Sequence, residues 1–353
     1  MGGGNTDSDA ARGIVDLLPV SARIDALFLF LANTGYLSRR RFIKTRLQAP
    51  IPPRFHYKFR ALQRTEAHPP VGPPFTEGSI RELRTTLVDS LLWMSSPMDF
   101  NDPFDTWVSW KIVGTADDVR AKMTRLAEGM GELSPQERAT GVERAVAASP
   151  EQRLEILRAS FAVQRQRFGV CSFGSDPREV LMWSHYAGSH AGVCLQFETA
   201  RDPGVFARAL PVSYVESSPV VNWLNDDALQ AVGESFTRKH ARWRYEGEHR
   251  IIQRESGRRY IRFRPDALTG IVFGCKADGD VKRAVAKLLT ERRERGFPRV
   301  KLYYSRQHEE RNEIQIWGDE DGPASHWTGR APIDHRTATA SDETAGTDLG
   351  RVR

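Results

Sequence analysis

The sequence predicts an α+β fold, in which a core of mixed or antiparallel sheet is flanked by helices. Strand-like apolar segments are interrupted by single helices, without the regular strand–helix repeat of a doubly wound sheet. Closely spaced strands with a Ser-Gly turn between them are typical of hairpins. The chain also lacks GxGxxG, GxxxxGK[ST] and GxSxG, the glycine signatures of dinucleotide-binding, P-loop and serine-hydrolase folds.

Three regions follow one another along the 353 residues. Residues 1–50 predict a helical N-terminal extension. The proline-rich stretch 49–54 predicts a stiff, extended start to a main domain over 51–318. Residues 319–353 are rich in Gly, Ala, Thr and charge, which predicts a disordered tail. With 40% hydrophobic and 27% charged residues, the composition is that of an ordinary soluble chain with a sizeable core.

The strands of the main domain are predicted from alternating apolar and polar residues or from short apolar runs. The expected strands are 55–62, 90–95, 106–113, 168–173, 192–198, 210–215, 243–255, 258–265, 270–275, 300–306 and 312–317. The strands 243–255 and 258–265 are joined at Ser256-Gly257, which predicts a hairpin.

The helices are predicted from helical periodicity and from residues that favour helix ends. The expected helices are 79–87, 116–167, 176–188, 202–209, about 225–242 and 280–296. Ser79 and Glu82 have the spacing of a capping box. The segment 116–167 is a predicted helical insert, broken at Ser134-Pro135 and Ser149-Pro150, because proline favours the first turn of a helix.

Basic residues concentrate in one segment. The net charge of the chain is +6, and residues 239–264 alone carry nine Lys or Arg against three Glu, the same surplus. Aromatic residues are interleaved there, namely Trp243, Tyr245, Tyr260 and Phe263. Such a surface suits nucleic-acid phosphates and bases, so a non-catalytic nucleic-acid- or nucleotide-binding module using a basic hairpin 239–264 is one hypothesis. A solvated charged hairpin is the alternative.

Cysteine usage and hydropathy bear on location. Cys171, Cys194 and Cys275 form no CxxC pair, so neither a disulfide framework nor a structural zinc site is expected, and a reducing cytoplasm is favoured. The best apolar run, 24–32, is too short for a membrane span, which needs about 20 apolar residues. No HExxH or complete EF-hand pattern occurs, so no metal is expected.

The stretch WRYEGEHRII holds two closely spaced carboxylates. On a strand, Glu246, Glu248 and Arg250 would share one face, because side chains alternate. Pairing with Arg262 and Arg264 on the next strand would make a salt-bridge ladder, in which each cross-strand pair contributes roughly 0.2–1 kcal/mol. In the functional alternative, the two carboxylates bind a ribose hydroxyl and stabilise a developing oxocarbenium ion.

Two further segments concentrate polar side chains. FNDPFD predicts an Asx-type turn whose Phe100 and Phe104 insert into the core. LMWSHYAGSH places His185 and Tyr186 near a helix end. His185 is either a polar group at the mouth of a site or a hydrogen-bonded structural histidine.

Several of these blocks occur together in a known family. YKFRAL, SLLWMSSPMDFNDPFD, VCSFGSDPREVLMWSHYAGSHAGVCLQFE, VSYV, KHARWRYEGEHRI and LTGIVFGC follow one another in this order. In this the chain resembles the bacterial family called Domain of Unknown Function 2971, over roughly residues 55 to 318. The N-terminal extension and the insert 116–167 are less characteristic of it. The compact form of that family implies an intracellular toxin or phage-defence effector.

A second resemblance concerns mechanism. An Arg on a first strand, a Ser on a middle strand and Glu-x-Glu on a later strand are similar to the arrangement in ADP-ribosyltransferases. The full Ser-Thr-Ser motif of that superfamily is absent, since CSFGS stands there. The resemblance implies an ADP-ribosyltransferase-like fold in which Arg60 contacts the NAD phosphates, Ser172 supports the nicotinamide pocket and Glu248 holds the ribose. Glu246 is then the first glutamate of the pair.

The same resemblance implies further pocket residues and a function. Arg250 is expected on the phosphate or leaving-group side, His185 and Tyr186 on the nicotinamide or acceptor side, and Tyr57 in the NAD pocket. The implied activity is NAD-dependent transfer of ADP-ribose, with NAD as the substrate and a protein or nucleic acid as the acceptor. No metal and no membrane partner are expected. A scaffold in which the motif blocks are purely structural is the third alternative.

Overall fold

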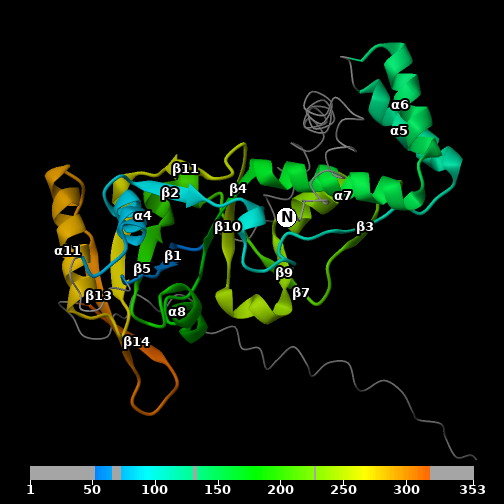
Figure 1. Cartoon of the computed structure of the whole chain (residues 1–353). Coiled ribbons are helices and arrows are strands. Elements are labelled where there is room, and N and C mark those ends of the chain that lie inside the picture. Colours follow the sequence, from blue (N-terminus) through cyan, green and yellow to red (C-terminus); the bar gives the residue numbers. More distant parts are fainter. Residues whose placement is uncertain (1–51, 66–72, 130–132, 226–227, 319–353) are drawn as a thin grey trace, which may run out of the picture.

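The structure is a computed structural model that describes residues 52–65, 73–129, 133–225 and 228–318. The predicted N-terminal helical extension (1–50) and disordered tail (319–353) lie outside the described residues. Figure 1 shows sheets at the centre of the molecule, helices packed around them, and a pair of helices that projects from one side.

The largest sheet has five strands in the order β1-β5-β12-β13-β14. These strands are β1 (Phe55–Arg60), β5 (Val193–Glu198), β12 (Leu268–Phe273), β13 (Lys301–Gln307) and β14 (Ile314–Gly318). The pair β12–β13 is parallel and the other pairs are antiparallel, so the sheet is mixed. The predicted α+β class with a mixed sheet is thereby confirmed.

Helices cover both faces of this sheet. On β5, Leu195 and Phe197 face the core formed with α4 (Glu77–Leu87) and α11 (Gly279–Glu294), whereas Cys194 faces α8 (Val180–Tyr186). This alternation is the ordinary consequence of the strand period of two. Because β5 lies between two strands and two helical layers, it is buried along nearly its whole length.

A second sheet meets the first at β1. It contains β4 (Phe168–Phe173), β10 (His249–Arg254) and β6 (Leu210–Pro211), in the antiparallel order β4-β10-β6. Just after β4, Gly174 exchanges two backbone hydrogen bonds with Tyr57 of β1, of 3.1 and 2.8 Å. The two sheets therefore join where β1, which carries Arg60, lies beside the end of β4, which carries Ser172.

Three two-stranded sheets complete the strands that the structure describes. They are β2 (Leu91–Met94) with β11 (Arg259–Arg262), β3 (Ser109–Lys111) with β8 (Val220–Asn222), and β7 (Ser213–Val215) with β9 (Arg238–His240). The predicted hairpin of 243–255 with 258–265 is wrong, because β10 pairs with β4 and β6 while β11 pairs with β2. The backbone N–H of Ser256 donates to Arg167 and that of Arg258 to Met94, so the turn directs the chain to another strand.

The segment 116–167, which the sequence predicts to be helical, contains three helices. They are α5 (Ala116–Glu128), α6 (Pro135–Ala147) and α7 (Pro150–Arg167). Ser134 and Ser149 cap the last two, each followed by Pro at the first helical position, as the sequence predicts. In Figure 1, α5 and α6 form the projecting pair, here called the helical arm, and α7 leads back to β4.

The remaining elements are short. They are η1 (Pro97–Asp99), η2 (Thr199–Arg201), α9 (Pro203–Phe206), α10 (Ala228–Ser235), η3 (Ala241–Glu246) and η4 (Pro265–Ala267). Two expectations need correction. The N-cap of α4 is Thr76 rather than Ser79, whose backbone N–H donates to the Thr76 hydroxyl. The helix expected over about 225–242 is only α10, followed by β9.

No helix in the described ranges combines the length and the apolar character that crossing a bilayer requires.

Candidate functional site

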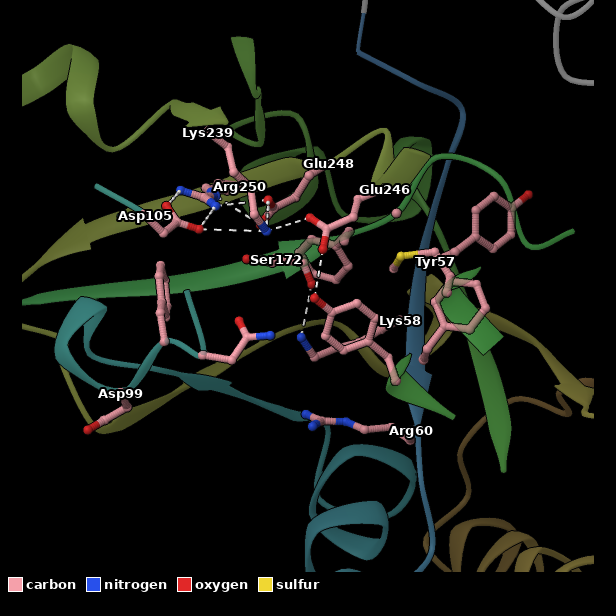
Figure 2. Close-up of a pocket in the computed structure, with 17 residues that line it drawn as sticks. Tyr57, Lys58, Arg60, Asp99, Asp105, Ser172, Lys239, Glu246, Glu248 and Arg250 are labelled. Carbon is pink, nitrogen blue, oxygen red and sulfur yellow. Dashed lines mark hydrogen bonds and ion pairs between the residues drawn. The ribbon is translucent and has the colours of Figure 1, made fainter. Parts of the chain in front are cut away.

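A cavity of about 330 Å³ opens beside the joint between the two sheets. This volume is at the lower end of the roughly 300–1,000 Å³ usual for small-molecule sites. Its walls come from β1, the end of β4, the loop after η1, helix α8 and the segment from β9 to β10, and Figure 2 shows the side chains that line it. The lining combines cations, carboxylates and aromatic rings, so the cavity suits a ligand that is both charged and planar.

The two glutamates reach this cavity through a sharp turn. Glu246 is the last residue of η3, and Gly247 follows in the left-handed conformation with φ 50°. A side chain at position 247 would meet the Ser175 hydroxyl at 2.1 Å, so only glycine fits there. The expectation that Glu246 and Glu248 lie on one continuous strand is wrong, because β10 begins only at His249. The turn nevertheless directs both carboxylates into the cavity.

Arg250 is the centre of a buried ion cluster. Its guanidinium binds Asp105 through Nη1–Oδ1 (2.8 Å) and Nη2–Oδ2 (2.6 Å). It also binds Glu248 through Nε–Oε1 and Nη2–Oε2, both 2.8 Å. Nη1 also donates to the Phe236 carbonyl at 3.0 Å, and the guanidinium lies over the Phe100 ring, 5.5 Å from its centre. Arg250 is fully buried. Such bidentate pairs are the strongest form of Arg–carboxylate contact.

Lys239 is the second cation of the cluster. Its Nζ lies 2.5 Å from Glu246 Oε2, 3.3 Å from Glu248 Oε2 and 3.6 Å from Asp105 Oδ2. Two cations therefore face three carboxylates, which leaves one surplus negative charge in a buried place. An uncompensated buried charge is costly, so one of the three carboxylates is expected to take up a proton readily.

The electrostatics identify that carboxylate as Glu246. Burial and the neighbouring Glu248 charge raise the pKa of Glu246 above its usual range, against the opposing effect of Lys239. For Glu248, burial also raises the pKa, but the charge and hydrogen bonds of Arg250, with help from Lys239 and Ser172, outweigh it and lower the pKa to about 2. The Tyr186 hydroxyl donates to Glu246 Oε1 at 2.7 Å. Glu248 is thus a fixed anion, whereas Glu246 can exchange a proton.

The opposite side of the cavity is cationic. In Figure 2, Lys58 lies between the ion cluster and Arg60. Lys58 Nζ donates to the Ser172 carbonyl at 3.0 Å, and burial lowers its pKa. Arg60 contacts Glu82 only at 4.0 Å, and 24% of its side chain is exposed. Arg60 is therefore a cation available to an anionic ligand, and the Lys58 amine lies beside it.

The cavity brings together most of the residues that the sequence predicts for the site. Those that line it are Tyr57, Arg60, Ser172, Tyr186, Glu246, Glu248 and Arg250. His185 is the exception: it is exposed, lies beside the ring of Tyr245 and does not line the cavity. Successive residues of a helix point about 100° apart, so the inward position of Tyr186 on α8 directs its predecessor elsewhere.

Sequence reasoning missed Asp105, Lys239 and Lys58. Asp105 belongs to FNDPFD, where the predicted Asx-type turn is confirmed, because Asp102 Oδ1 accepts from the Phe104 N–H at 2.9 Å. The expected insertion of Phe104 into the core is wrong, since 68% of Phe104 is exposed. It is Asp105 that points inward, and its partner Arg250 lies 145 residues further along the chain. An ion pair between residues so far apart leaves no signal in the sequence around either residue.

The predicted salt-bridge ladder does not form. Arg262 donates to the Asp89 carbonyl and Arg264 pairs with Asp266, whereas the two glutamates make their ion pairs inside the buried cluster. The segment 239–264 is also not one basic surface, because its cations Lys239 and Arg250 and its aromatic residue Phe263 are buried.

Within the described part of the chain, no three His, Cys, Asp or Glu side chains gather as metal ligands would. The lining residues offer a ligand both charged and aromatic contacts, and Arg60 could meet a phosphate or carboxylate group of that ligand.

Comparison with known families gave one match. Residues 182–251 match the model described as "Protein of unknown function (DUF2971)". The match is shorter than the 55 to 318 that the motif blocks indicate, but it contains Tyr186, Glu246, Glu248 and Arg250. Comparisons with curated proteins and with solved structures gave no significant match.

Proposed function

We propose, for a chain that belongs to the DUF2971 family through residues 182–251, that the cavity binds NAD and breaks the bond between nicotinamide and ribose. The ADP-ribose group is then passed to water or to a macromolecular acceptor. The observation that carries this proposal is the meeting of Arg60, Ser172 and the Glu246–Glu248 pair around one cavity, from segments far apart in the sequence. This is the set of residues that the resemblance to ADP-ribosyltransferases implies.

The lining offers a contact for each part of NAD. Arg60, beside Lys58, presents positive charge for the phosphates. Tyr57 and Tyr186 offer aromatic surfaces for the nicotinamide ring. The carboxylates on the opposite wall face the ribose between them. At about 330 Å³ the cavity encloses the reacting part of the ligand, with the remainder extending through its open side.

The chemistry needs an anion near the ribose. As the bond between the nicotinamide nitrogen and the ribose C1′ breaks, its electron pair leaves with nicotinamide, and positive charge develops on the ribose. Fixed charges that are already oriented stabilise such a transition state without reorganisation. Glu248, held at both oxygens by Arg250 and Lys239, supplies a fixed anion.

Glu246 completes the reaction by moving a proton. The nucleophile, water or an acceptor hydroxyl or amine, loses a proton when it bonds to C1′. A carboxylate whose pKa is raised toward the working pH is suited to accept it. This division differs from the sequence expectation, in which Glu248 holds the ribose, because both Glu248 oxygens already have cationic partners.

The test is release of nicotinamide from NAD by the purified full chain. We expect Glu246→Gln to reduce the rate about 10²–10⁴-fold, the usual contribution of general acid–base catalysis. Arg60→Ala should weaken NAD binding in isothermal titration. Glu143→Gln, which removes an exposed carboxylate from the helical arm, is the matched control and should change neither quantity. A rate unchanged in Glu246→Gln, or the absence of any NAD binding, would overturn the proposal.

The nucleic-acid alternative keeps exposed arginines of the segment 239–264, among them Arg242, Arg258 and Arg262, but not the single basic hairpin on which it was based. Lys239 and Arg250 satisfy buried carboxylates, and the two strands of the supposed hairpin belong to different sheets. Binding of labelled RNA that weakens steeply with salt would restore it, because phosphate contacts release counterions.

A further inference from the structure

Two lysines line the same cavity in opposite surroundings. Lys239 has three carboxylates within 4.0 Å of its Nζ, and their charges raise its pKa although burial opposes them. Lys58, by contrast, has no carboxylate within that distance among the described residues. Its Nζ donates to the Ser172 carbonyl and lies 5.3 Å from the centre of the Phe173 ring, which offers only a weak cation–π contact. An ammonium group without an ionic partner is unfavourable in such a place. Lys58 is therefore the cavity lysine that is suited to the uncharged amine form.

The surroundings of Lys58 define what it can meet. The Ser172 carbonyl accepts one N–H, which orients the amine and leaves the nitrogen lone pair of the uncharged form for the cavity. Arg60 stands two residues along β1, so the two side chains leave the same face of the strand about 7 Å apart. A phosphate bound at Arg60 would hold a carbonyl carbon of the same small molecule near Lys58.

We propose that Lys58 forms an imine with a phosphorylated aldehyde, such as the open-chain form of a ribose phosphate. Its nitrogen attacks the aldehyde carbon and loses its two protons, the carbonyl oxygen leaves as water, and a carbon–nitrogen double bond forms. Amine and aldehyde give imine and water, so neither an oxidant nor a reductant is required. Glu246, which can hold a proton, lines the same cavity and can protonate the leaving oxygen.

This proposal does not depend on NAD cleavage. ADP-ribose, the product of that reaction when water is the acceptor, is one aldehyde of the required class, and ribose 5-phosphate from any other source is another. The two proposals can therefore fail separately.

The experiment uses the full chain with ADP-ribose, ribose 5-phosphate or unphosphorylated ribose, each reduced with cyanoborohydride. Labelled lysines are identified by peptide mass spectrometry. Lys287, exposed on α11, is the internal control for ordinary amine reactivity. We expect preferential labelling of Lys58 over Lys287 by the phosphorylated aldehydes, by about tenfold for each unit by which its pKa is lowered. The preference should persist at mildly acidic pH and fall in Arg60→Ala.

The ligand arms separate the possible sources. Labelling by ribose 5-phosphate alone points to a small sugar phosphate, whereas labelling by ADP-ribose alone points to the product of NAD cleavage. Equal labelling of Lys58 and Lys287, or labelling of Lys58 that is the same without a phosphate, would overturn the proposal. A third result would also overturn the proposal: Lys58 stays unlabelled, and Lys58→Met binds NAD more weakly. Lys58 would then be a cation that binds phosphate. Because the preference is read within the wild-type chain, it does not depend on whether Lys58→Met folds.

Discussion

Glu246 and Glu248 are separated by a single glycine and have opposite electrostatic surroundings. Both are buried, and burial alone would raise both pKa values. The difference arises from Arg250, whose guanidinium hydrogen-bonds both oxygens of Glu248 and neither oxygen of Glu246. Two chemically identical side chains therefore have different roles, one as a fixed charge and one as a proton carrier.

This difference predicts a ranking of stability. Glu248→Gln should lower the free energy of unfolding by about 3–5 kcal/mol, the usual cost of removing one partner from a buried ion pair. Glu246→Gln should cost clearly less, because it removes the surplus negative charge of the cluster. Urea denaturation of both variants measures the two values. The reverse ranking would show that Glu246 rather than Glu248 balances the cations.

A buried histidine predicts a pH dependence. Burial, together with the neighbouring His249, lowers the pKa of His56 from 6.5 to about 4, and its Nε2 donates to the Phe206 carbonyl at 3.1 Å. Below about pH 6.5 the unfolded chain binds a proton that the folded chain excludes, so stability should fall from pH 6.5 to about 4 and then level off. This group alone contributes on the order of 3 kcal/mol to that fall.

Unfolding free energies across this pH range, for the wild type and for His56→Gln, measure this effect. The variant should show a shallower slope between pH 6.5 and 4. An identical slope in both proteins would assign the dependence to other groups, of which His249, whose pKa burial also lowers, is the nearest.

For single residues, the sequence predicts which side chains line the site better than it predicts which side chains contact one another. The glutamates, Arg60 and Ser172 stand in recognisable local patterns, and all of them line the cavity. Asp105 could not be predicted, because its position in the cluster depends on how separate sheets meet rather than on the residues beside it. That His185 does not line the cavity could not be predicted either, since a helix end alone does not fix which side chain points inward.

At the scale of elements, the turn at Gly247 decides where the carboxylates point. Gly247→Ala adds a methyl group beside the Ser175 hydroxyl and keeps a left-handed backbone that alanine disfavours. It should cost roughly 1–3 kcal/mol and weaken NAD binding, because the turn can relax only by moving Glu246 or Glu248. Gly233→Ala is the matched control: it lies in α10 with open space around it and should be neutral or stabilising by up to about 1 kcal/mol.

Thermal unfolding and titration with NAD measure both variants. Equal behaviour of the two alanine substitutions would show that the Gly247 turn tolerates a side chain. A Gly247→Ala protein that loses stability but binds NAD normally would separate the turn from the cavity.

Elements were predictable where their signals are local. Ser134 and Ser149, each before a proline, mark the starts of α6 and α7, and every predicted strand segment contains a strand. The hairpin failed because pairing depends on competition among strands. The short, alternating β11 finds a better partner in β2, where Tyr260 packs edge-on against Trp93.

At the scale of the whole molecule, the helical arm stands apart from the cavity. None of the lining residues belongs to α5 or α6, and Figure 1 shows the arm projecting away from the sheets. Replacing residues 117–147 with a short Gly/Ser linker should therefore leave NAD binding unchanged relative to the wild type. Stability should fall slightly, because the ring of Trp223 loses its contact with Lys122 of the arm.

Isothermal titration and circular dichroism of the shortened chain test this expectation. A shortened protein that keeps its helical and sheet signals but no longer binds the ligand would make the arm part of the site. The residues that match the DUF2971 model, 182–251, also lie outside the helical arm.

The ion cluster also has a consequence for the order of folding. Its members come from the loop at Asp105, from β9, from the turn between η3 and β10, and from β10 itself, so it closes contacts that span 145 residues. Such non-local contacts form late, because loop-closure entropy opposes them until the surrounding structure exists. A half-assembled cluster is worse than none, since it buries charges without partners. We therefore expect a partly folded chain to contain its sheets but not to bind NAD. The ability to bind NAD would appear in a single late step of folding.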